Sequence, residues 1–316
     1  MKTLLHIGFP HTGNERLRRG LLEDHPEVFL VASRDAGDRR ASTTRQALSR
    51  ELLEPIRDQD SLDYSQRDVD SVRTELLNLR PPGQRLVVSD ESFSVTFDPS
   101  TRLTDRQLVA ERLATTFRDG RVLITVRSQL SILPEIHSQL ARAATGRELP
   151  PYGEWVAGEL ANASTGVMSM LNFDRTVDLY QKVFAPSKVT VMAHESLVAH
   201  PGQFARTLAD LLDIDPDLGA RLFTDDASRK PRQMPAGLAR AEARNERLGR
   251  AIRGLRGIAP ERLKDLAQRV PVGHADQTLS PELTHAVVER FENSNRTLAA
   301  QAGLDLDALG WFSGRS

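Results

Sequence analysis

A short segment near the N-terminus, "GFPHTGNE" (residues 8–15), has residue types and a spacing that suit anion binding. It follows an apolar run and precedes a charged, helix-forming run, so a strand should enter a helix through a turn here. Gly8 and Gly13 have the spacing of a phosphate-binding loop, and the amides of Thr12 to Glu15 would point into the turn at the positive end of the helix dipole. The two residues after Gly13 are not the lysine and hydroxyl residue of a nucleotide triphosphatase loop, which disfavours that class. The pattern predicts an anion cradle, with a plain strand–turn–helix as the alternative.

A second candidate is Arg127, which ends the predicted strand "RVLITVR" (121–127). Ligands of open α/β sheets bind beyond the carboxyl ends of the strands, where a guanidinium can hold a phosphate through two hydrogen bonds. The alternative is a surface arginine that pairs with Asp90 or Glu91.

The composition bounds the class of protein. The chain has 316 residues, 39% of them hydrophobic, which is enough for a large core. Its 42 Lys and Arg balance 43 Asp and Glu to a net charge of −1, so no basic field supports bulk binding of nucleic acid. The absence of cysteine excludes disulfides, thiolate metal sites and cysteine nucleophiles.

The N-terminal apolar run is interrupted by His6 and Pro10 and is followed by no small-residue cleavage site, so it does not match a signal peptide. No apolar run is long enough to span a bilayer. We therefore expect a soluble, cytoplasmic protein without a membrane span.

Five short runs predict buried parallel strands, because each is apolar, rich in β-branched residues and bounded by turn or charged residues. They are residues 3–9, 28–33, 85–91, 121–127 and 188–196. Helical stretches alternate with these strands, at 14–24, 43–56, 104–120 (with Thr104 as N-cap and Gly120 as C-cap) and 202–214. The alternation predicts an α/β fold: an open, mostly parallel sheet flanked by helices, like that of P-loop nucleotide-binding proteins.

We expect one domain over residues 1–316, with an α/β core at 1–200 and a helical C-terminal cap at 201–316. After about residue 200 no further strand is predicted. Helices are predicted at 237–257 and at 280–303, the latter starting at Ser-Pro-Glu and ending at Gly303.

Two shorter segments complete the C-terminal part. Residues 216–235 combine proline and charge without periodicity, which predicts a mobile loop. The final segment "LDLDALGWF" is expected to dock Leu309 and Trp311 on the body of the protein.

The loop at 8–15 resembles the 5′-phosphosulfate loop of PAPS-dependent sulfotransferases (PAPS is 3′-phosphoadenosine 5′-phosphosulfate). The usual form of that loop is Pro-Lys-Ser/Thr/Ala-Gly-Thr/Asn-Thr, followed by a helix. Three further segments are similar to family segments in the same order. They are "LITVRSQLSILPEIHSQL" (123–140), like the 3′-phosphate segment; "VTVMAHESLVAHPGQFARTLADLLDI" (189–214), like the strand–Glu–x–Leu–helix segment; and 279–311, like the C-terminal helix of bacterial members with its "SNRTLA" core. The resemblance spans nearly the whole chain.

This resemblance implies an enzyme that moves a sulfuryl group from PAPS to a hydroxyl or amine of a small molecule or glycan, without a metal. By their positions in the family motifs, the donor-binding residues would be Pro10, Thr12, Gly13, Asn14, Glu15, Arg127 and Ser131. His11 takes the place of the family's lysine and, when protonated, would neutralise the leaving oxygen; the alternative is a neutral surface histidine. Arg229, Lys230 and Arg232 lie where many members close a basic loop over the nucleotide, with a solvated charge run as the alternative.

Two carboxylates depart from the family pattern. Glu15 replaces a threonine that donates to the 5′-phosphate, and two like charges about 4 Å apart repel by roughly 4 kcal/mol at an effective dielectric near 20. The helix dipole returns only about 0.3–1 kcal/mol. Either Glu15 points outward, paired with Arg18 or Arg19, or the donor binds weakly or not at all. Glu135 replaces a serine that shares the 3′-phosphate, and Ser131 or Ser138, about one helical turn away on either side, is its substitute.

A general base should remove the proton of the acceptor. Glu91, in "VVSDESFS", is the candidate and His137 the reserve; a strand-end carboxylate can instead cap a helix or form an ion pair. Glu195 is interpreted as a structural residue that binds backbone amides. Tyr152, Trp155, Phe173 and Tyr180 are interpreted as core residues, with Tyr152 and Trp155 as an alternative wall for the acceptor.

Two other functions remain open at this stage. The altered positions His11, Glu15 and Glu135 are compatible with a sulfotransferase-fold protein that no longer catalyses and acts as a binding or scaffold partner. A P-loop kinase is disfavoured by the missing lysine. The identity of the acceptor and the oligomeric state cannot be predicted from these residues.

Overall fold

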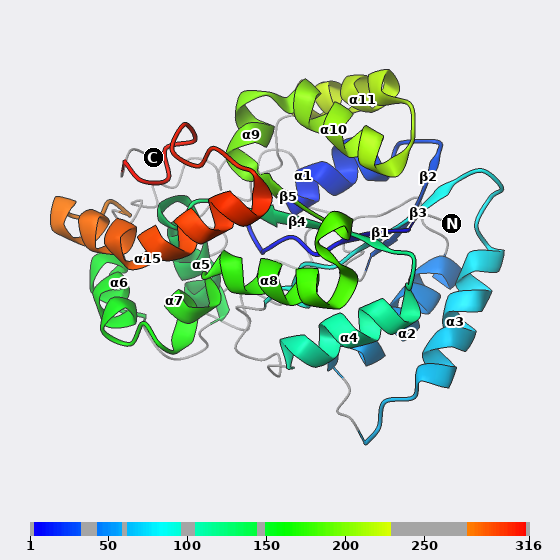
Figure 1. Ribbon diagram of the computed structural model, residues 1–316, viewed down its shortest axis with the longest axis horizontal. Helices are drawn as coiled ribbons and strands as arrows, with labels where there is room; N and C mark the ends of the chain where they lie inside the picture. The colour runs from blue at the N-terminus through cyan, green and yellow to red at the C-terminus, as the bar shows by residue number, and fades with distance from the viewer. Residues whose placement is uncertain are drawn as a thin grey trace, which may run out of the picture.

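The computed structural model describes residues 3–32, 43–58, 62–95, 105–143, 149–228 and 277–313. Five strands form one parallel sheet in the order β2-β3-β1-β4-β5 (Figure 1). They are β1 (Thr3–His6), β2 (Val28–Ala32), β3 (Arg85–Ser89), β4 (Arg121–Val126) and β5 (Val189–Ala193). The predicted α/β class, with an open parallel sheet between helices and a C-terminal helix, is confirmed.

The strand order places β1 in the middle of the sheet. Leu4 of β1 is in register with Val87 of β3 on one side and with Arg121 of β4 on the other. The strands that follow β1 in the sequence are therefore added on one side of it (β2 and β3) and then on the other (β4 and β5). In an open α/β sheet this is the point where a ligand crevice forms at the carboxyl ends of the strands.

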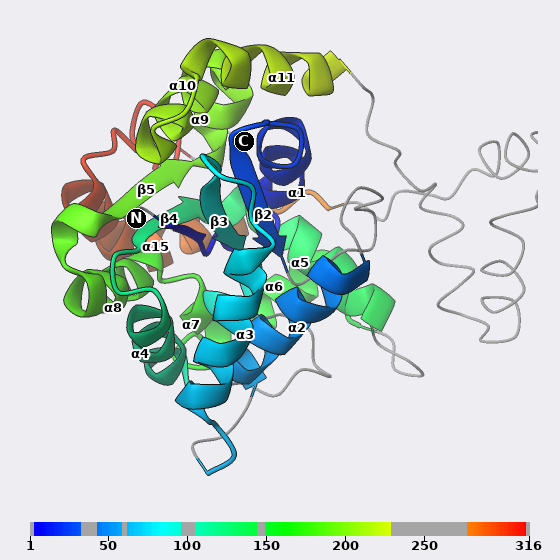
Figure 2. The same ribbon diagram turned by 90° about the vertical axis from the view of Figure 1, so that its right-hand side faces the viewer.

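Helices cover both faces of the sheet (Figures 1 and 2). One face carries α1 (Asn14–Leu17) with a π-helical continuation (Arg18–Leu22), α9 (His194–Ala199), α10 (Pro201–Leu212) and α11 (Pro216–Ser228). The other face carries α2 (Thr43–Asp58), α3 (Gln66–Asn78), α4 (Arg106–Thr116), α5 (Gln129–Ala143), α6 (Tyr152–Ala161), α7 (Gly166–Met170), α8 (Phe173–Phe184) and α15 (Pro281–Ala302).

Two apolar clusters follow the alternation of side chains along the strands. Leu4 and Leu123 pack in the cluster under α1, α10 and α11, whereas their neighbours Leu5 and Ile124 pack in the cluster on the opposite face. Successive strand residues point to opposite faces, so a sheet covered on both sides needs runs that are apolar at every position. This is why the five strands were recognisable in the sequence.

Several boundaries differ from the sequence-based expectation. β1 ends at His6 and not at residue 9, although the N–H groups of Ile7 and Phe9 still donate to the carbonyls of Leu123 and Thr125 at 2.9 and 3.0 Å. α4 is capped by Asp105, whose carboxylate accepts from Gln107 N, and Thr104 lies outside the described residues.

The C-cap prediction for α4 was wrong. The helix ends at Thr116, with Phe117 as the C-cap residue. Gly120 lies beyond it, where its N–H donates to the Phe117 carbonyl in a tight turn before β4. The structure also adds α3, which the sequence analysis did not predict and whose N-cap Ser65 accepts from Asp68 N.

The mobile loop predicted at 216–235 was wrong for residues 216–228, which form α11. The carboxylate of Asp215 accepts from the N–H groups of Asp217 and Leu218 and so supplies the helix start. Phe223 is fully buried against Phe204 of α10, with ring centroids 6.4 Å apart. Ala220 is buried in the same cluster, so packing holds in place a segment whose proline and charged residues suggested a loop. Residues 229–235 lie outside the described part of the chain.

The C-terminal segment packs on the core as predicted. α15 starts at the Ser280 cap, whose hydroxyl accepts from Leu283 N, and ends at Gly303, whose φ of 65° is left-handed. Trp311 is buried with its ring centroid 6.0 Å from that of Phe173, and Leu309 packs against the same cluster. None of the helices in the described ranges is long and apolar enough to cross a membrane.

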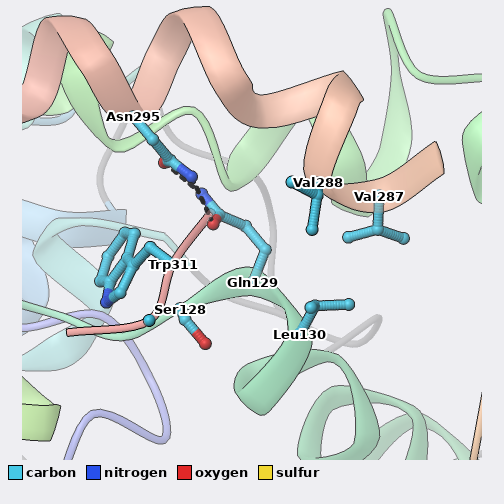
Figure 3. A pocket seen from close by; sticks show the side chains of 8 residues that line it. Ser128, Gln129, Leu130, Val287, Val288, Asn295 and Trp311 are labelled. Atoms are coloured by element: carbon cyan, nitrogen blue, oxygen red, sulfur yellow. Dashed lines mark hydrogen bonds between the residues drawn. The ribbon is translucent and has the colours of Figure 1, made fainter. Parts of the chain in front are cut away.

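A buried pair of amides joins α15 to the start of α5 (Figure 3). Gln129 Nε2 donates to Asn295 Oδ1 at 2.9 Å, Asn295 Nδ2 donates back to Gln129 Oε1 at 3.1 Å, and Gln129 also donates to the Leu171 carbonyl. Both side chains border a small hollow at this junction, with Ser128, Leu130, Val287, Val288, Gly310 and Trp311. Because Gln129 follows Arg127 by two residues, α15 fixes the segment that carries Arg127.

Asn295→Leu should therefore destabilise the fold by about 1–3 kcal/mol, since it leaves the buried Gln129 amide without its partner. In urea unfolding, the double variant Gln129→Leu/Asn295→Leu should recover part of this loss, because both polar groups are then removed. The control is Asn293→Leu, an exposed position on the same helix, which should change stability by less than about 0.5 kcal/mol. Equal losses for Asn293→Leu and Asn295→Leu would contradict the role of the pair.

Candidate functional site

The loop between β1 and α1 turns through two left-handed residues. His11 has φ 63° and Gly13 has φ 84°, after which α1 begins at Asn14. Glycine adopts this conformation without strain, whereas a left-handed histidine costs free energy that the surroundings must offset. A Cβ at Gly13 would also lie only 2.9 Å from Cδ2 of His194, so this position requires glycine for two reasons.

The start of α1 presents unbonded backbone donors. Between described residues, the N–H groups of Thr12 to Glu15 make no hydrogen bond, while Leu17 N already bonds to the Gly13 carbonyl. Orphan N–H groups at the first turn of a helix bind anions, and the helix dipole favours negative charge there. The predicted cradle is therefore compatible with the backbone geometry of the loop.

A buried polar network holds the loop from below. The Thr12 hydroxyl and the Asn14 amide both donate to the Phe9 carbonyl, at 2.5 and 2.7 Å. The Thr125 hydroxyl, at the end of β4, lies 2.8 Å from the Thr12 hydroxyl and donates to Asn14 Oδ1 at 2.9 Å. A Cβ at Gly8 would overlap Thr125 and Asn14, so the second glycine of the motif makes room for this network.

His6 joins the network to β3. Its Nδ1 lies 2.8 Å from the Ser89 hydroxyl and its Nε2 3.3 Å from the Thr125 hydroxyl. Burial lowers the pKa of His6 to about 4, against a smaller raising effect of Asn14, because the charged ring would lose its hydration. His6 is therefore neutral at physiological pH, and the hydroxyl groups on its two sides satisfy both ring nitrogens.

His11 lies on the outer side of the loop. Its Nε2–H donates to Gln139 Oε1 of α5 at 2.7 Å, and its carbonyl accepts from Nη1 of Arg127 at 3.0 Å. The ring is half-buried. The fixed ring and the carbonyl contact together tie the loop to α5 and to the end of β4.

Glu15 points away from the cradle. Its carboxylate pairs with Arg19 one helical turn later at 2.8 Å, and its side chain is 68% exposed. The outward orientation that we gave as one of two possibilities is the one in the structure, so the repulsion of about 4 kcal/mol does not arise. Arg18 instead pairs with Glu23.

Arg127 lies at the carboxyl end of β4, half-buried, and its Nε is buried without a partner. No ion pair joins it to another described residue, since Asp90 instead pairs with Arg57 at 3.4 Å, so the alternative of a surface pair with Asp90 or Glu91 is not found. Ser128 and Ser131 follow, with their hydroxyls 2.9 Å apart.

The other carboxylates singled out in the sequence, those of Glu195, Glu135 and Glu91, lie in three different environments. Glu195 Oε1 accepts from Ser128 N at 2.9 Å, in agreement with its interpretation as a binder of backbone amides. Glu135 is exposed on α5. Glu91 follows the buried Asp90, and its Oε2 accepts from Asn14 Nδ2 at 3.2 Å, which places the candidate base beside the loop.

The reserve base His137 is buried in an aromatic cluster. Its Nε2–H donates to the Pro150 carbonyl at 3.0 Å, and its ring lies 5.5 Å from that of Tyr152 and 5.3 Å from that of Trp155. Phe173 and Tyr180 are buried as well, so all four aromatic residues interpreted as core are core residues. The alternative that Tyr152 and Trp155 line the acceptor site has no support in their burial.

Two basic residues at the loop were missed by the sequence analysis. His194, the first residue of α9, lies against Gly13, and the guanidinium of Arg16 lies 4.9 Å from the ring centroid of Phe223. The only signal for His194 was its position directly after a strand of the same parallel sheet, next to Glu195. Arg229, Lys230 and Arg232 lie outside the described residues.

Comparisons with known proteins support the architecture. No family model and no curated protein matches the chain. Among solved structures, the chain is similar to the crystal structure of a sulfotransferase from Alicyclobacillus acidocaldarius, with a TM-score of 0.56 and 13% sequence identity over 98% of this chain and 99% of that one. The chain has the fold of a sulfotransferase.

That fold places the loop after the central strand at the edge where Arg127, Glu91 and His194 converge. Among the described residues, no group of three or more His, Asp or Glu side chains is arranged to hold a metal ion. The backbone amides and guanidinium groups at this edge suit an anionic ligand, while the carboxylates of Glu91 and Glu195 accept from Asn14 Nδ2 and Ser128 N.

The buried His6 predicts a pH-dependent stability. Because the pKa of His6 is lowered in the folded state, the unfolded chain takes up the proton first as the pH falls. The contribution of the neutral His6 to the free energy of unfolding is therefore complete above pH 6.5 and is lost as the pH falls toward 4. Between pH 7.5 and 5.5 the free energy of unfolding should fall by about 1.3 kcal/mol on this account. In denaturant unfolding at both pH values, His6→Gln should remove this part of the loss, and His200→Gln, at an exposed position, should retain it. An unchanged pH dependence in His6→Gln would show that another group is responsible.

Proposed function

We propose that this protein transfers a sulfuryl group from PAPS to a hydroxyl or amine of a small molecule or glycan. The observation that carries the proposal is the unbonded N–H groups of Thr12 to Glu15, in the loop that Arg127, at the end of β4, contacts through the His11 carbonyl. The sulfotransferase fold supports the same conclusion.

The residues present fit a nucleotide with phosphate at two positions. The orphan amides after the left-handed Gly13 suit the 5′-phosphosulfate end. The buried, unpartnered Nε of Arg127 and the hydroxyl of Ser131 suit the 3′-phosphate. We include Pro10 as the residue that starts the turn, and Arg229 and Lys230 as further cations for the nucleotide.

Bound PAPS supplies an activated sulfuryl group whose bridging oxygen becomes negative as the bond breaks. The chain's part is to place donors at that oxygen before the reaction, which is the strongest form of electrostatic catalysis. The amides of Thr12 to Glu15 and the protonated ring of His11 would do this. His11 already directs its Nε2–H to Gln139, so protonation would add the charge at Nδ1 while the ring keeps its orientation.

Glu91 is the proposed general base. It borders the loop through the amide of Asn14, on the β3 side of the cradle, so an acceptor held there would lie between the base and the donor end. The carboxylate would take the proton from the acceptor hydroxyl or amine as the new bond to sulfur forms. Nothing in the described residues identifies the acceptor further.

Adenosine 3′,5′-bisphosphate, the product left by PAPS, should raise the melting temperature of the protein by several degrees at about 100 times its Kd, where linkage gives about 2.7 kcal/mol. Arg127→Ala should abolish this shift, because it removes the guanidinium at the end of β4. The matched control is Arg118→Ala, exposed before the opposite end of the same strand, which should keep it. No shift for the wild type at millimolar nucleotide would refute donor binding.

A second variant series separates an active enzyme from a protein that has lost donor binding and acts as a scaffold. Because Glu15 points outward, Glu15→Thr alone should change bisphosphate affinity by less than about threefold. His11→Lys should bind at least as tightly as the wild type, measured by calorimetry. If only the double variant His11→Lys/Glu15→Thr binds the nucleotide, the wild-type site has decayed and the scaffold function is favoured.

A further inference from the structure

Three basic side chains from different elements meet at Gly13. His194 at the start of α9 lies against Gly13, with Cδ2 2.9 Å and Nε2 3.5 Å from the position of a Cβ there. Arg127 reaches the same loop from the end of β4, where its Nη1 donates to the His11 carbonyl. Arg16, on α1, stands over the Phe223 ring, and its charge, like that of Arg127, acts on His194.

The two arginines have unused hydrogen-bonding capacity. The Nε atoms of Arg16 and Arg127 are both buried without a partner, although a buried guanidinium N–H normally has one. Neither arginine forms an ion pair with another described residue. A buried donor without an acceptor costs free energy, so a ligand oxygen beside this loop would be favoured by both guanidinium groups.

The acidic residue next to His194 in the sequence is Glu195, and its carboxylate binds a backbone amide. Glu195 follows His194 on α9, and its Oε1 accepts from Ser128 N at 2.9 Å, while its Oε2 is buried without a partner. The charges of Arg127 and Arg16 therefore act on His194 without a carboxylate ion-paired to either arginine among the described residues, which favours the neutral ring. An anion with two negative charges would reverse this balance.

We propose that His194 is a third member of the anion site with Arg16 and Arg127, neutral in the free protein and protonated when the site holds a phosphate dianion. The nucleotide would thus bind together with one proton. In naming a phosphate of the bisphosphate nucleotide as the natural ligand, this inference rests on the proposed function; the anion site itself does not.

The charges around His194 support this assignment. Burial first, and then the positive charges of Arg127 and Arg16, lower the pKa of His194 to about 4 in the free protein. A dianion beside the ring would screen both arginines and raise the pKa. The unbound protein would then carry fewer protons than the complex, so affinity must fall as the pH rises. His11 is the competing source of such a pH dependence, because its ring lies on the other side of the same loop.

The test is the affinity of the protein for sulfate at pH 6 and pH 8, measured by calorimetry in buffers of different ionisation enthalpy. Sulfate remains a dianion over this range, whereas a phosphate ester titrates near pH 6 and would confuse the result. One linked proton allows at most tenfold per pH unit, so binding should be between about threefold and a hundredfold tighter at pH 6, with net proton uptake. The same titration with adenosine 3′,5′-bisphosphate then tests the nucleotide.

His194→Gln should bind sulfate with less proton uptake and a weaker dependence on pH than the wild type. His194→Asn, with a shorter side chain, should behave in the same way. His200→Gln, exposed at the end of the same helix, should retain the full dependence. In the wild type, the NMR signal of the His194 ring, identified by its loss in His194→Gln, should titrate between pH 5.5 and 8 only with the anion present.

The outcomes separate this inference from the proposed function. Proton uptake that survives in His194→Gln and disappears in His11→Gln overturns the role of His194, as does binding without any proton uptake. If sulfate binds with the proton but the bisphosphate does not bind at all, the anion site stands and the proposed function fails. If the bisphosphate binds equally at both pH values and His194 does not titrate, the proposed function stands and this inference fails.

Discussion

The buried hydroxyl of Thr125 is the point on which the loop depends. It lies at the end of the strand next to β1, and it contacts His6, Thr12 and Asn14 within hydrogen-bonding distance. Each of these groups has left water, so each must find a partner or lose free energy. The same network occupies the Phe9 carbonyl, since Thr12 and Asn14 both donate to it. These buried contacts fix the side chains of Thr12 and Asn14, whose backbone N–H groups remain unbonded among the described residues.

A second set of buried hydrogen bonds links the Arg127 side of the site to the C-terminal helix α15. Arg127 is placed by β4 and by the segment that starts α5, and α5 is held by the amide pair between Gln129 and Asn295. The resemblance at the "SNRTLA" segment thus has a physical meaning, because Asn295 lies within it and holds Gln129, two residues after Arg127 of the proposed anion site. The last helix is part of the site's framework.

The charge pattern around the loop is compatible with the proposed anion site despite the altered donor residues. Glu15 turns outward to Arg19, and Glu135 is exposed, so neither carboxylate is directed into the cradle. Positive charge comes instead from Arg127, Arg16 and the two histidines that flank the loop. Since imidazole gains its charge only when an anion or low pH favours it, such a site responds to pH more strongly than one built on lysine.

The sequence by itself determined the sheet, the two-sided helical cover, the turn at Gly13 and the strand-end position of Arg127, because apolar runs and glycine turns are local patterns. Only the tertiary structure decided which way Glu15 points, what Thr125 and His6 contact, and that His194 and Arg16 join Arg127. The buried contacts join residues far apart in the chain, 119 positions for His6 and Thr125 and 181 for Gly13 and His194, whereas Glu15 pairs with Arg19 four residues away. The helix at 216–228 was missed because its proline and charged residues are also typical of a loop. The structure holds it in place by burying Ala220 and Phe223, the latter against Phe204 of α10.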